Sequence, residues 1–244
     1  MDAPGPDEAS PLAEREVSRF DHEADVVIVG LGCAGACAAL EASSQGADTL
    51  VLERAGGGGG TSAMSGGLLY LGGGTPLQKA LGFEDDPESM FAYLMAACGP
   101  GADEALVRPY CEHSVEHFHW LAGLGLPFKE AFFADSHEPP GDESLTHSGS
   151  EEAWPFCEIA RPAPRGHCAS VVGPKGPLLM QTLLGGVERA GARLQTGVRA
   201  HALVTADDGS VIGLVARHEG RAVAIRARRG AVSYTHLRAH ETKT

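Results

Sequence analysis

Apolar positions in the first part of this chain form short runs separated by polar and glycine-rich turns. The run at residues 25–29 predicts a buried strand, a helix-compatible stretch follows at residues 33–44, and a second apolar run covers residues 49–52. This β-α-β order is typical of an α/β fold built on a parallel sheet.

The middle of the chain predicts helices and then a long irregular segment. Thr75 and Asp86 each precede a proline, which is the arrangement of a helix cap followed by the first helical turn. We expect the second of these helices over residues 88–98 and a third over 103–123. The buried face of the third would consist of Leu106, Tyr110, Val115, Phe118 and Leu121. Residues 126–175 lack regular periodicity, but their isolated aromatic side chains favour an ordered, packed loop.

The last third of the chain returns to regular patterns. Residues 180, 183, 184 and 187 are apolar at helical spacing, and three short strands are expected at 198–206, 211–217 and 221–228, followed by the start of another at 229–232. We therefore predict an α/β fold over residues 23–232, in which a parallel sheet with helices carries an antiparallel β-meander.

Between the first strand and the first helix lies the motif Gly30-x-Gly32-x-x-Gly35. Gly30 permits a tight turn, Gly32 leaves room for a pyrophosphate, and Gly35 lets the helix pack close to the sheet. Glu53 ends the second apolar run, where it can accept hydrogen bonds from ribose hydroxyls. The spacing predicts a dinucleotide site.

A second glycine-rich stretch indicates which dinucleotide is bound. Ten of the nineteen residues from 56 to 74 are glycine, and 59–67 also contains small hydroxylated residues. Bare main-chain N–H groups and hydroxyls suit a polyanionic cofactor that must be approached closely. A flexible linker is the alternative, but the apolar residues 68–71 disfavour it. We interpret the stretch as part of a flavin site.

Charge and cysteine content narrow the possible partners. The net charge of −13 argues against a nucleic-acid or anionic membrane partner, and no apolar run is long enough to span a membrane. The six cysteines show no CxxC pair, which favours a reduced, cytoplasmic protein. We expect residues 1–22 to be a disordered tail. Residues 233–244 break the strand pattern and are expected to be a non-native tail, so that the native protein would continue past Val232.

Several motifs together identify a family. The chain resembles the fumarate-reductase-like flavoproteins and, within them, the FAD-dependent 3-ketosteroid dehydrogenases, most closely the Δ4-(5α) type. The resemblance covers about residues 20–232. It implies a Rossmann-like FAD-binding domain over residues 23–232 that is incomplete at its C-terminal end. Besides the two glycine stretches it rests on the segments 66–75, 99–103, 110–118 and 162–167.

The resemblance implies how FAD would be bound. Gly30, Gly32, Ala34 and Gly35 would lie along the pyrophosphate, and Glu53 with Arg54 would meet the adenosine ribose. Thr61 and Ser62 would bind phosphate or ribityl oxygens, Ser65, Gly66 and Gly67 would pass near the flavin ring, and main-chain groups of Arg199 and Ala200 would meet the adenine. Gly60 stands where covalent relatives carry a histidine, which implies non-covalent FAD.

The family's reaction removes a proton and a hydride from neighbouring carbons beside a ketone, with the hydride passing to flavin N5. The substrate would be a steroid-like or other enone or ketone, and the electron acceptor is unknown. Because the family's catalytic side chains would follow Val232, we name no catalytic residue. The alternatives are a fumarate-reductase-like enzyme acting on a small dicarboxylate or enoate, an NAD-dependent dehydrogenase, and a non-catalytic FAD-binding fragment, which is our expectation for the isolated chain.

Other patterns have competing interpretations. The segment from His113 to His117 matches the H-x-x-E-H zinc motif, although we expect no metal because the flavoprotein resemblance already explains this stretch. Cys33 and Cys37 form either a redox pair or, as we favour, ordinary packing. Arg165 and His167 bind substrate or anchor a loop, with the anchor favoured. Tyr70 either faces the flavin or packs in the core.

Overall fold

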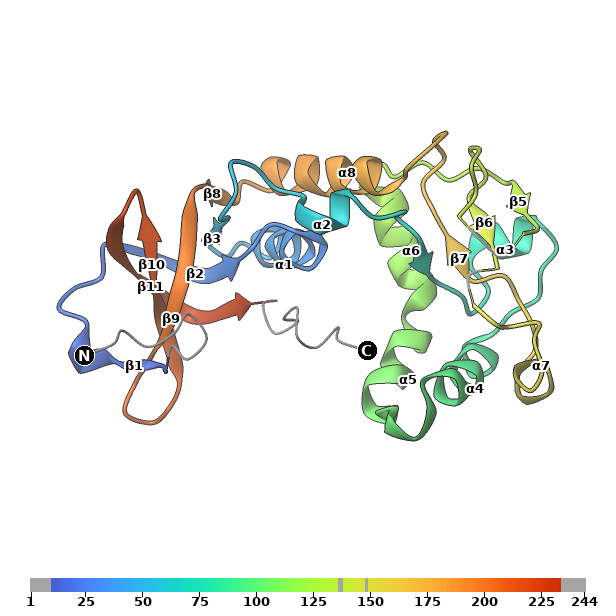
Figure 1. Cartoon of the computed structure of the whole chain (residues 1–244), viewed down its shortest axis with the longest axis horizontal. Helices are drawn as coiled ribbons and strands as arrows, with labels where there is room; N and C mark the ends of the chain where they lie inside the picture. The colour runs from blue at the N-terminus through green and yellow to red at the C-terminus, as the bar shows by residue number, and fades with distance from the viewer. Residues whose placement is uncertain (1–9, 136–137, 148, 234–244) are drawn as a thin grey trace. The chain divides into compact units, whose positions relative to one another are not determined.

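The computed structural model describes residues 10–135, 138–147 and 149–233. The chain divides into two compact units (Figure 1): Met1–Thr61 with Leu183–Thr244 form the first, and Ser62–Thr182 form the second. The expected FAD-binding domain at 23–232 therefore comprises two units, each of which is described by itself.

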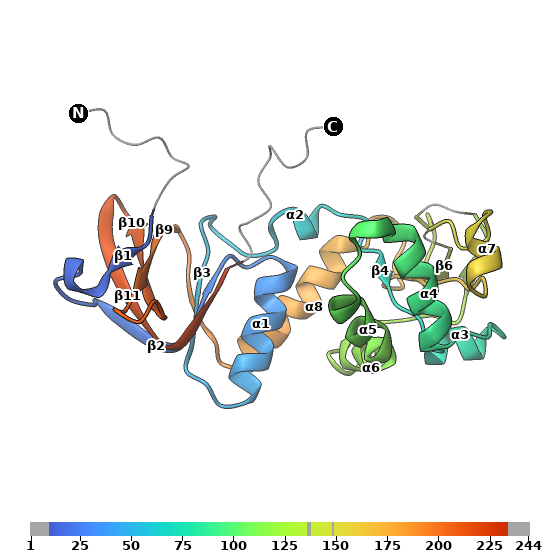
Figure 2. The ribbon, with the colours of Figure 1, turned by 90° about the horizontal axis from the view of Figure 1, so that it is seen from below.

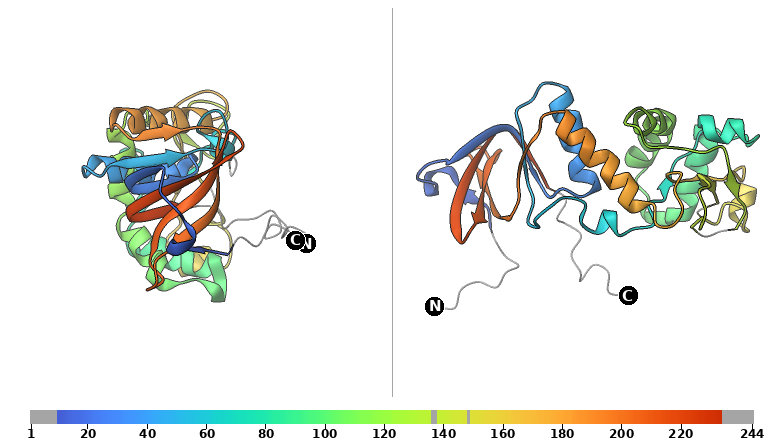
Figure 3. Two further views of the ribbon diagram at one scale, coloured as in Figure 1. Left: turned by 90° about the vertical axis from the view of Figure 1, so that its left-hand side faces the viewer. Right: turned by 90° about the horizontal axis from the view of Figure 1, so that it is seen from above.

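Among the described residues the first unit contains a seven-stranded sheet of order β1-β9-β10-β11-β2-β3-β8 (Figures 1 and 2). Strands β2, β3 and β8 are parallel to one another, β9, β10 and β11 form the antiparallel meander, and β11 joins the two parts by pairing in parallel with β2. The strands are visibly twisted relative to one another (Figure 3). Their bounds are β1 Leu12–Ala13, β2 His22–Val29, β3 Thr49–Leu52, β8 Arg193–Gln195, β9 Val198–Thr205, β10 Val211–His218 and β11 Arg221–Ser233.

Burial explains why the first β-α-β unit was readable from sequence. All four residues of β3 are buried, as expected for a parallel strand covered on both faces. Helix α1, Cys33–Ser44, buries Gly35, Ala36, Ala39 and Leu40, and its small side chains permit close packing. The predicted parallel sheet and meander are confirmed.

Three expectations for the first unit differ from the structure. Leu12 and Ala13 of the expected disordered tail pair with β9, because their extended backbone meets the free edge at Val204 and Thr205. Strand β8 was not predicted, since its short sequence has an exposed Leu194 and no apolar alternation. The strands expected at 221–228 and 229–232 are one strand with an irregularity between Ala227 and Gly230. Residues 1–9 and 234–244 lie outside the described residues.

Among its described residues the second unit combines helices with a four-stranded sheet of order β4-β7-β6-β5. Figure 1 labels β5, β6 and β7 of this sheet. Both predicted caps are confirmed: Thr75 Oγ1 accepts from Gln78 N at 3.2 Å, and an Asp86 carboxylate oxygen accepts from Ser89 N at 2.7 Å. The helices of this unit are α3 Pro76–Ala80, α4 Pro87–Cys98, α5 Glu104–Glu112, α6 Ser114–Gly123 and α7 Phe156–Ile159, with a short 3-10 turn at Gly99–Gly101. Helices α2 Gly60–Ala63 and α8 Gly176–Arg189 each have residues in both units, and a second 3-10 turn, Glu14–Glu16, belongs to the first unit. The strands are β4 Leu69–Tyr70, β5 Phe132–Phe133, β6 Leu145–Thr146 and β7 Gly166–His167.

The helix expected over 103–123 is broken at His113, which separates α5 from α6. Leu106 is 72% exposed and Tyr110 is 41% exposed, so the predicted apolar face is wrong at these two positions. The buried side chains instead follow the spacing of Cys111, Ser114, Phe118 and Leu121. The prediction followed the larger apolar residues and overlooked a cysteine and a serine.

The irregular segment 126–175 is ordered and packed over its described residues, 126–135, 138–147 and 149–175, as its aromatic residues indicated. Phe128 packs on Phe118 with ring centroids 4.6 Å apart, and Phe132 packs on Phe83 at 4.8 Å. Trp154 is the exception, with 76% of its surface exposed. The described part of this segment contains three strands and the short helix α7.

Candidate functional site

The glycine motif forms a tight turn between β2 and α1. Gly30 has φ +92°, and its N–H donates to Leu52 O at 2.8 Å. A Cβ on Gly35 would collide with Gly30 O and come within 3.0 Å of Gly30 C, so only glycine allows this approach. Gly32 is the N-cap of α1 and supplies no side-chain cap. The start of α1, which includes the exposed Ala34, is therefore a place where main-chain N–H groups can meet phosphate.

A cavity of about 570 Å³ lies beside this turn in the first unit. Its walls come from the ends of β2 and β3, from β9 and from the end of β11. Five of the predicted cofactor residues line it, namely Gly30, Glu53, Arg54, Arg199 and Ala200. The size is typical of a pocket for a small organic ligand. The residues present therefore fit an adenosine group, with a carboxylate on one wall and the extended backbone of β9 on another.

The Glu53 carboxylate is held in place by main-chain donors. Oε2 accepts from Leu31 N and Oε1 from Ala55 N, both at 2.7 Å. The main chain of Glu53 also bonds Gln195 O and Val198 N, which fixes the end of β3 against the segment between β8 and β9. The sequence pointed to Glu53 but not to its contact with Leu31, because that bond joins positions 22 residues apart.

The second glycine stretch begins in the first unit and continues in the second. Gly60 and Thr61 are exposed at the start of α2, and Ser62 follows in the same turn. Ser65 Oγ donates to Ser62 O at 2.7 Å and accepts from Gly67 N at 3.2 Å, so this hydroxyl closes the loop upon itself. Gly67 has φ +70°. We call residues 62–67 the flavin loop.

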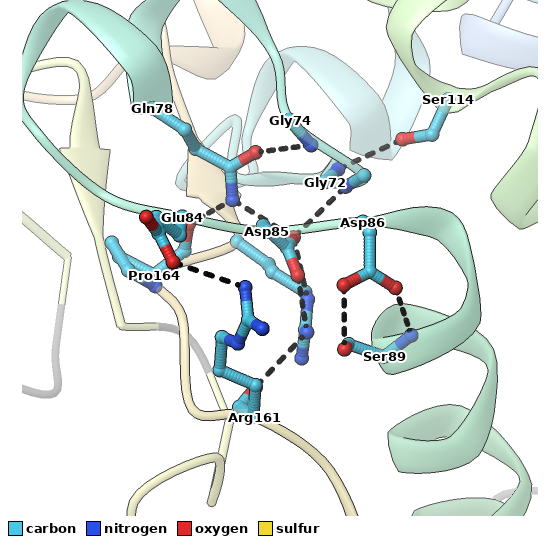
Figure 4. Close-up of polar contacts among 12 residues, drawn as sticks. Gly72, Gly74, Gln78, Glu84, Asp85, Asp86, Ser89, Ser114, Arg161 and Pro164 are labelled. Carbon is cyan, nitrogen blue, oxygen red and sulfur yellow. Dashed lines mark hydrogen bonds and ion pairs between the residues drawn. The ribbon is translucent and has the colours of Figure 1, made fainter.

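Arg165 and His167 belong to a buried polar network in the second unit. Figure 4 shows the part of this network around Gln78 and Asp85. Both side chains of the Arg165–Asp85 pair are fully buried, with Nη2 2.7 Å from Oδ1 and Nε 3.0 Å from Oδ2. Asp85 also accepts from Gly73 N, and Gln78 donates to Asp85 and to Pro164 O. A bidentate ion pair with these extra hydrogen bonds anchors a loop, as the sequence favoured.

His167 is buried and neutral. Its Nδ1 donates to Arg165 O at 3.2 Å, because a carbonyl oxygen can only accept, and Nε2 accepts from Thr75 Oγ1 at 2.9 Å. Burial lowers the pKa of His167 to about 4, against smaller opposing effects of the Arg165 carbonyl and the Asp85 charge. This imidazole is part of the framework.

The other residues that the sequence singled out are the cysteine pair, the H-x-x-E-H segment and Tyr70. A hydrogen bond from Cys37 lowers the pKa of Cys33 to about 7, and the same contact with burial raises the pKa of Cys37. His113 Nδ1 lies 2.9 Å from Glu116 Oε2 on the surface, and no cluster of three or more His, Cys, Asp or Glu side chains among the described residues could hold a metal ion. The Tyr70 ring stacks on Tyr93 with centroids 6.1 Å apart. In the part of the chain that the structure describes, no helix has the length and apolar character of a membrane span.

Comparison with known proteins identifies a family and relatives that are similar to this chain. Residues 25–242 match the family described as FAD binding domain. The chain is 36% identical over 202 residues to 3-oxo-5-alpha-steroid 4-dehydrogenase of Comamonas testosteroni, which covers 80% of this chain and 38% of that protein. It is 51% identical, with a TM-score of 0.88, to 3-ketosteroid-delta4-(5alpha)-dehydrogenase from Rhodococcus jostii RHA1, solved in complex with 4-androstene-3,17-dione; the match covers 91% of this chain and 48% of that one.

A more distant match is a flavocytochrome c3 fumarate reductase at 27% identity and a TM-score of 0.73, covering 88% of this chain and 34% of that chain. The chain thus spans about half or less of the length of these relatives. The predicted α/β fold and the predicted cofactor, FAD, are confirmed by the family match and by the steroid dehydrogenase structure. The turn, the cavity and the glycine loop suit a dinucleotide, in agreement with the family match. This chain belongs to the FAD binding domain family.

Proposed function

We propose that this chain is the FAD-binding portion of a flavoprotein that desaturates 3-ketosteroids. The observation that carries the proposal is the likeness to the Rhodococcus jostii dehydrogenase, at 51% identity over 91% of this chain, against 27% for the fumarate reductase. Reduction of a small dicarboxylate or enoate is the competing function. The electron acceptor stays unassigned.

FAD in this proposal is held by groups along both glycine stretches. The turn with Gly30, Gly32, Ala34 and Gly35 takes the pyrophosphate, and the cavity beside Glu53, Arg54 and Ala200 takes the adenosine. The flavin loop, with Gly60 and Thr61 before it, takes the ribityl chain and the ring; its members are Ser62, Ser65, Gly66 and Gly67. The close approach of Gly35 to Gly30 and the cavity at Glu53 support the first part. Binding is non-covalent because Gly60 offers no side chain for attachment.

The chain's own task is to bind and orient the cofactor, and FAD supplies the hydride acceptor when it is bound. No residue of this chain is assigned to proton abstraction, since the buried His167 and Arg165 are committed to structural contacts. None of the six cysteines, all of which lie in the described part, forms a disulfide, which supports the proposed cytoplasmic location.

Two experiments test the proposal. The purified chain should retain FAD through gel filtration and release all of it on denaturation, and NAD should not compete. A chain that binds no flavin, or that keeps flavin after denaturation, contradicts the assignment.

Substrate class is tested with two chimeras, in which this chain replaces the matching segment of the Rhodococcus jostii dehydrogenase or of the flavocytochrome c3 fumarate reductase. We expect oxidation of a saturated 3-ketosteroid with an artificial acceptor by the first chimera and no fumarate reduction by the second. Activity in the second alone would favour the dicarboxylate function.

A further inference from the structure

The Lys175 side chain is buried in a cage of main-chain carbonyl oxygens. Its exposed fraction is 0%, and Nζ lies 2.7 Å from Pro139 O, 3.0 Å from Gly141 O, and 3.1 Å from Val171 O and Gly173 O, so its three N–H groups are shared among four carbonyl oxygens. No carboxylate among the described residues lies within ion-pair distance of Nζ, so the direct contacts of the buried cation are carbonyl oxygens, and the Asp142 carboxylate adds an electrostatic attraction without direct contact. Burying an ammonium group is costly, and a cage of this kind therefore points to a specific task.

The residue after Lys175 supports the flavin loop from one side. A Cβ on Gly67 would lie only 2.5 Å from Gly176 N and 2.6 Å from Lys175 C. A Cβ on Gly176 would in turn lie 2.7 Å from Ser62 O. Main chain therefore packs directly on main chain, and a shift of Lys175 and Gly176 would move the loop.

The cage also supports the flavin loop from a second side. The Glu138 carboxylate touches Gly66, where an added Cβ would overlap it. Pro139, which follows Glu138, contributes one of the caged carbonyls, and Gly141 contributes another. One ammonium group thus joins the two segments, 138–141 and 171–176, that contact the flavin loop.

We propose that Lys175 is a positioning residue for the cofactor, because its caged ammonium holds the flavin loop in its binding conformation before FAD arrives. The inference rests on the proposed function, in which residues 62–67 take the ribityl chain and ring. An ordered loop loses less conformational entropy on binding, so the caged cation raises FAD affinity without touching FAD.

A second consequence follows from the chemistry of the cage. Carbonyl oxygens that replace a hydration shell bind ammonium and potassium ions. If Lys175 is shortened to alanine, the cage keeps its four oxygens and gains the space of the removed side chain. A free ammonium or potassium ion should then replace the missing group.

The test compares wild type, Lys175→Ala, Lys175→Gln and a control, Lys129→Ala. Lys129 lies on the neighbouring surface, where Nζ pairs with Asp142 at 2.7 Å and half of its side chain is exposed. FAD affinity is measured by quenching of flavin fluorescence in sodium, potassium and ammonium chloride at equal ionic strength. Hydrogen exchange of residues 62–67 is measured in each salt without FAD.

We expect Lys175→Ala in sodium to bind FAD about tenfold more weakly, equivalent to about 1.4 kcal/mol, and to exchange faster in the loop. Ammonium or potassium should restore both properties for Lys175→Ala, and should change neither wild type nor Lys129→Ala. The FAD affinity of Lys175→Gln should lie between those of wild type and Lys175→Ala, since the shorter glutamine amide donates to fewer of the carbonyls.

Wild-type affinity and loop exchange in Lys175→Ala would overturn the proposal, as would a loss that neither cation restores. Failure of both variants to fold in every salt would also overturn it, because Lys175 would then hold the whole unit and not the loop. If wild type itself binds no FAD, the proposed function fails, while exchange of the loop still decides whether Lys175 orders it.

Discussion

Acidification from pH 7 to pH 5 should destabilise this protein through the buried imidazole of His167. In the folded state its pKa is lowered from 6.5 to about 4 by burial. The folded protein therefore favours the neutral imidazole. The stability that this provides is complete above about pH 6.5 and is lost as the pH falls towards 4, because the unfolded chain then binds a proton that the folded chain excludes.

The magnitude follows from the two pKa values. A fall from 6.5 to about 4 corresponds to about 3 kcal/mol of unfolding free energy when it is fully expressed, at about 1.4 kcal/mol per pKa unit. At pH 5 about 2 kcal/mol of this is lost. For a chain of this length, that loss lowers Tm by about 4 to 8 °C.

The assay compares urea unfolding of wild type and His167→Gln at pH 7 and pH 5. Glutamine does not titrate, so the variant lacks the stability that the neutral imidazole provides at pH 7 and does not lose it at pH 5. The variant should be the less stable protein at pH 7, and the difference in unfolding free energy between the two proteins should shrink by about 2 kcal/mol at pH 5. Burial also lowers the pKa of His117, but this group is present in both proteins and its effect cancels. Parallel losses of stability in the two proteins would refute the assignment of His167 as a buried neutral imidazole.

Three further predictions concern the cofactor turn and the buried ion pair. Gly35→Ala should abolish FAD retention in gel filtration, because its Cβ would collide with Gly30 O; retention by the variant would contradict this account of the turn. Glu53→Gln should weaken FAD binding about tenfold by fluorescence titration, since a charge-assisted hydrogen bond is worth about 1.5 kcal/mol or more, and an unchanged affinity would remove Glu53 from the site. Arg165→Met should lower the unfolding free energy in urea by about 3 to 5 kcal/mol because it leaves Asp85 buried without its partner, whereas Arg161→Ala, at an exposed pair, should cost at most about 1 kcal/mol; equal losses would refute the burial argument.

The parts of the structure that were predictable from sequence depend on short-range rules. The turn from Gly30 to Gly35, the capped starts at Thr75 and Asp86, and the meander after residue 198 all follow from backbone conformation or apolar spacing over a few residues. The sequence could not place the break at His113, because α5 and α6 read as one continuous helical pattern. Strand β8 gave no signal, since it is stabilised by pairing with β3 and not by its own alternation.

The supports of the candidate site were the least predictable feature. Lys175 lies in a glycine- and proline-rich loop and has the sequence signature of an exposed lysine. Its partners are carbonyl oxygens, which every residue possesses, so the cage leaves no mark in the side chains that form it. The cavity at Glu53 was predicted only as a set of residues, because its walls at Glu53 and Ala200 are nearly 150 positions apart in the chain.

Three of the segments on which the family resemblance rests have a structural role that the sequence did not reveal. Residues 66–75, 110–118 and 162–167 bond to one another: Gly72 N donates to Ser114 Oγ at 2.8 Å, Tyr110 Oη donates to Tyr70 O, and Thr75 bonds His167. These motifs therefore contribute to one packed framework. It follows that substitutions at these contacts should change the stability of the second unit.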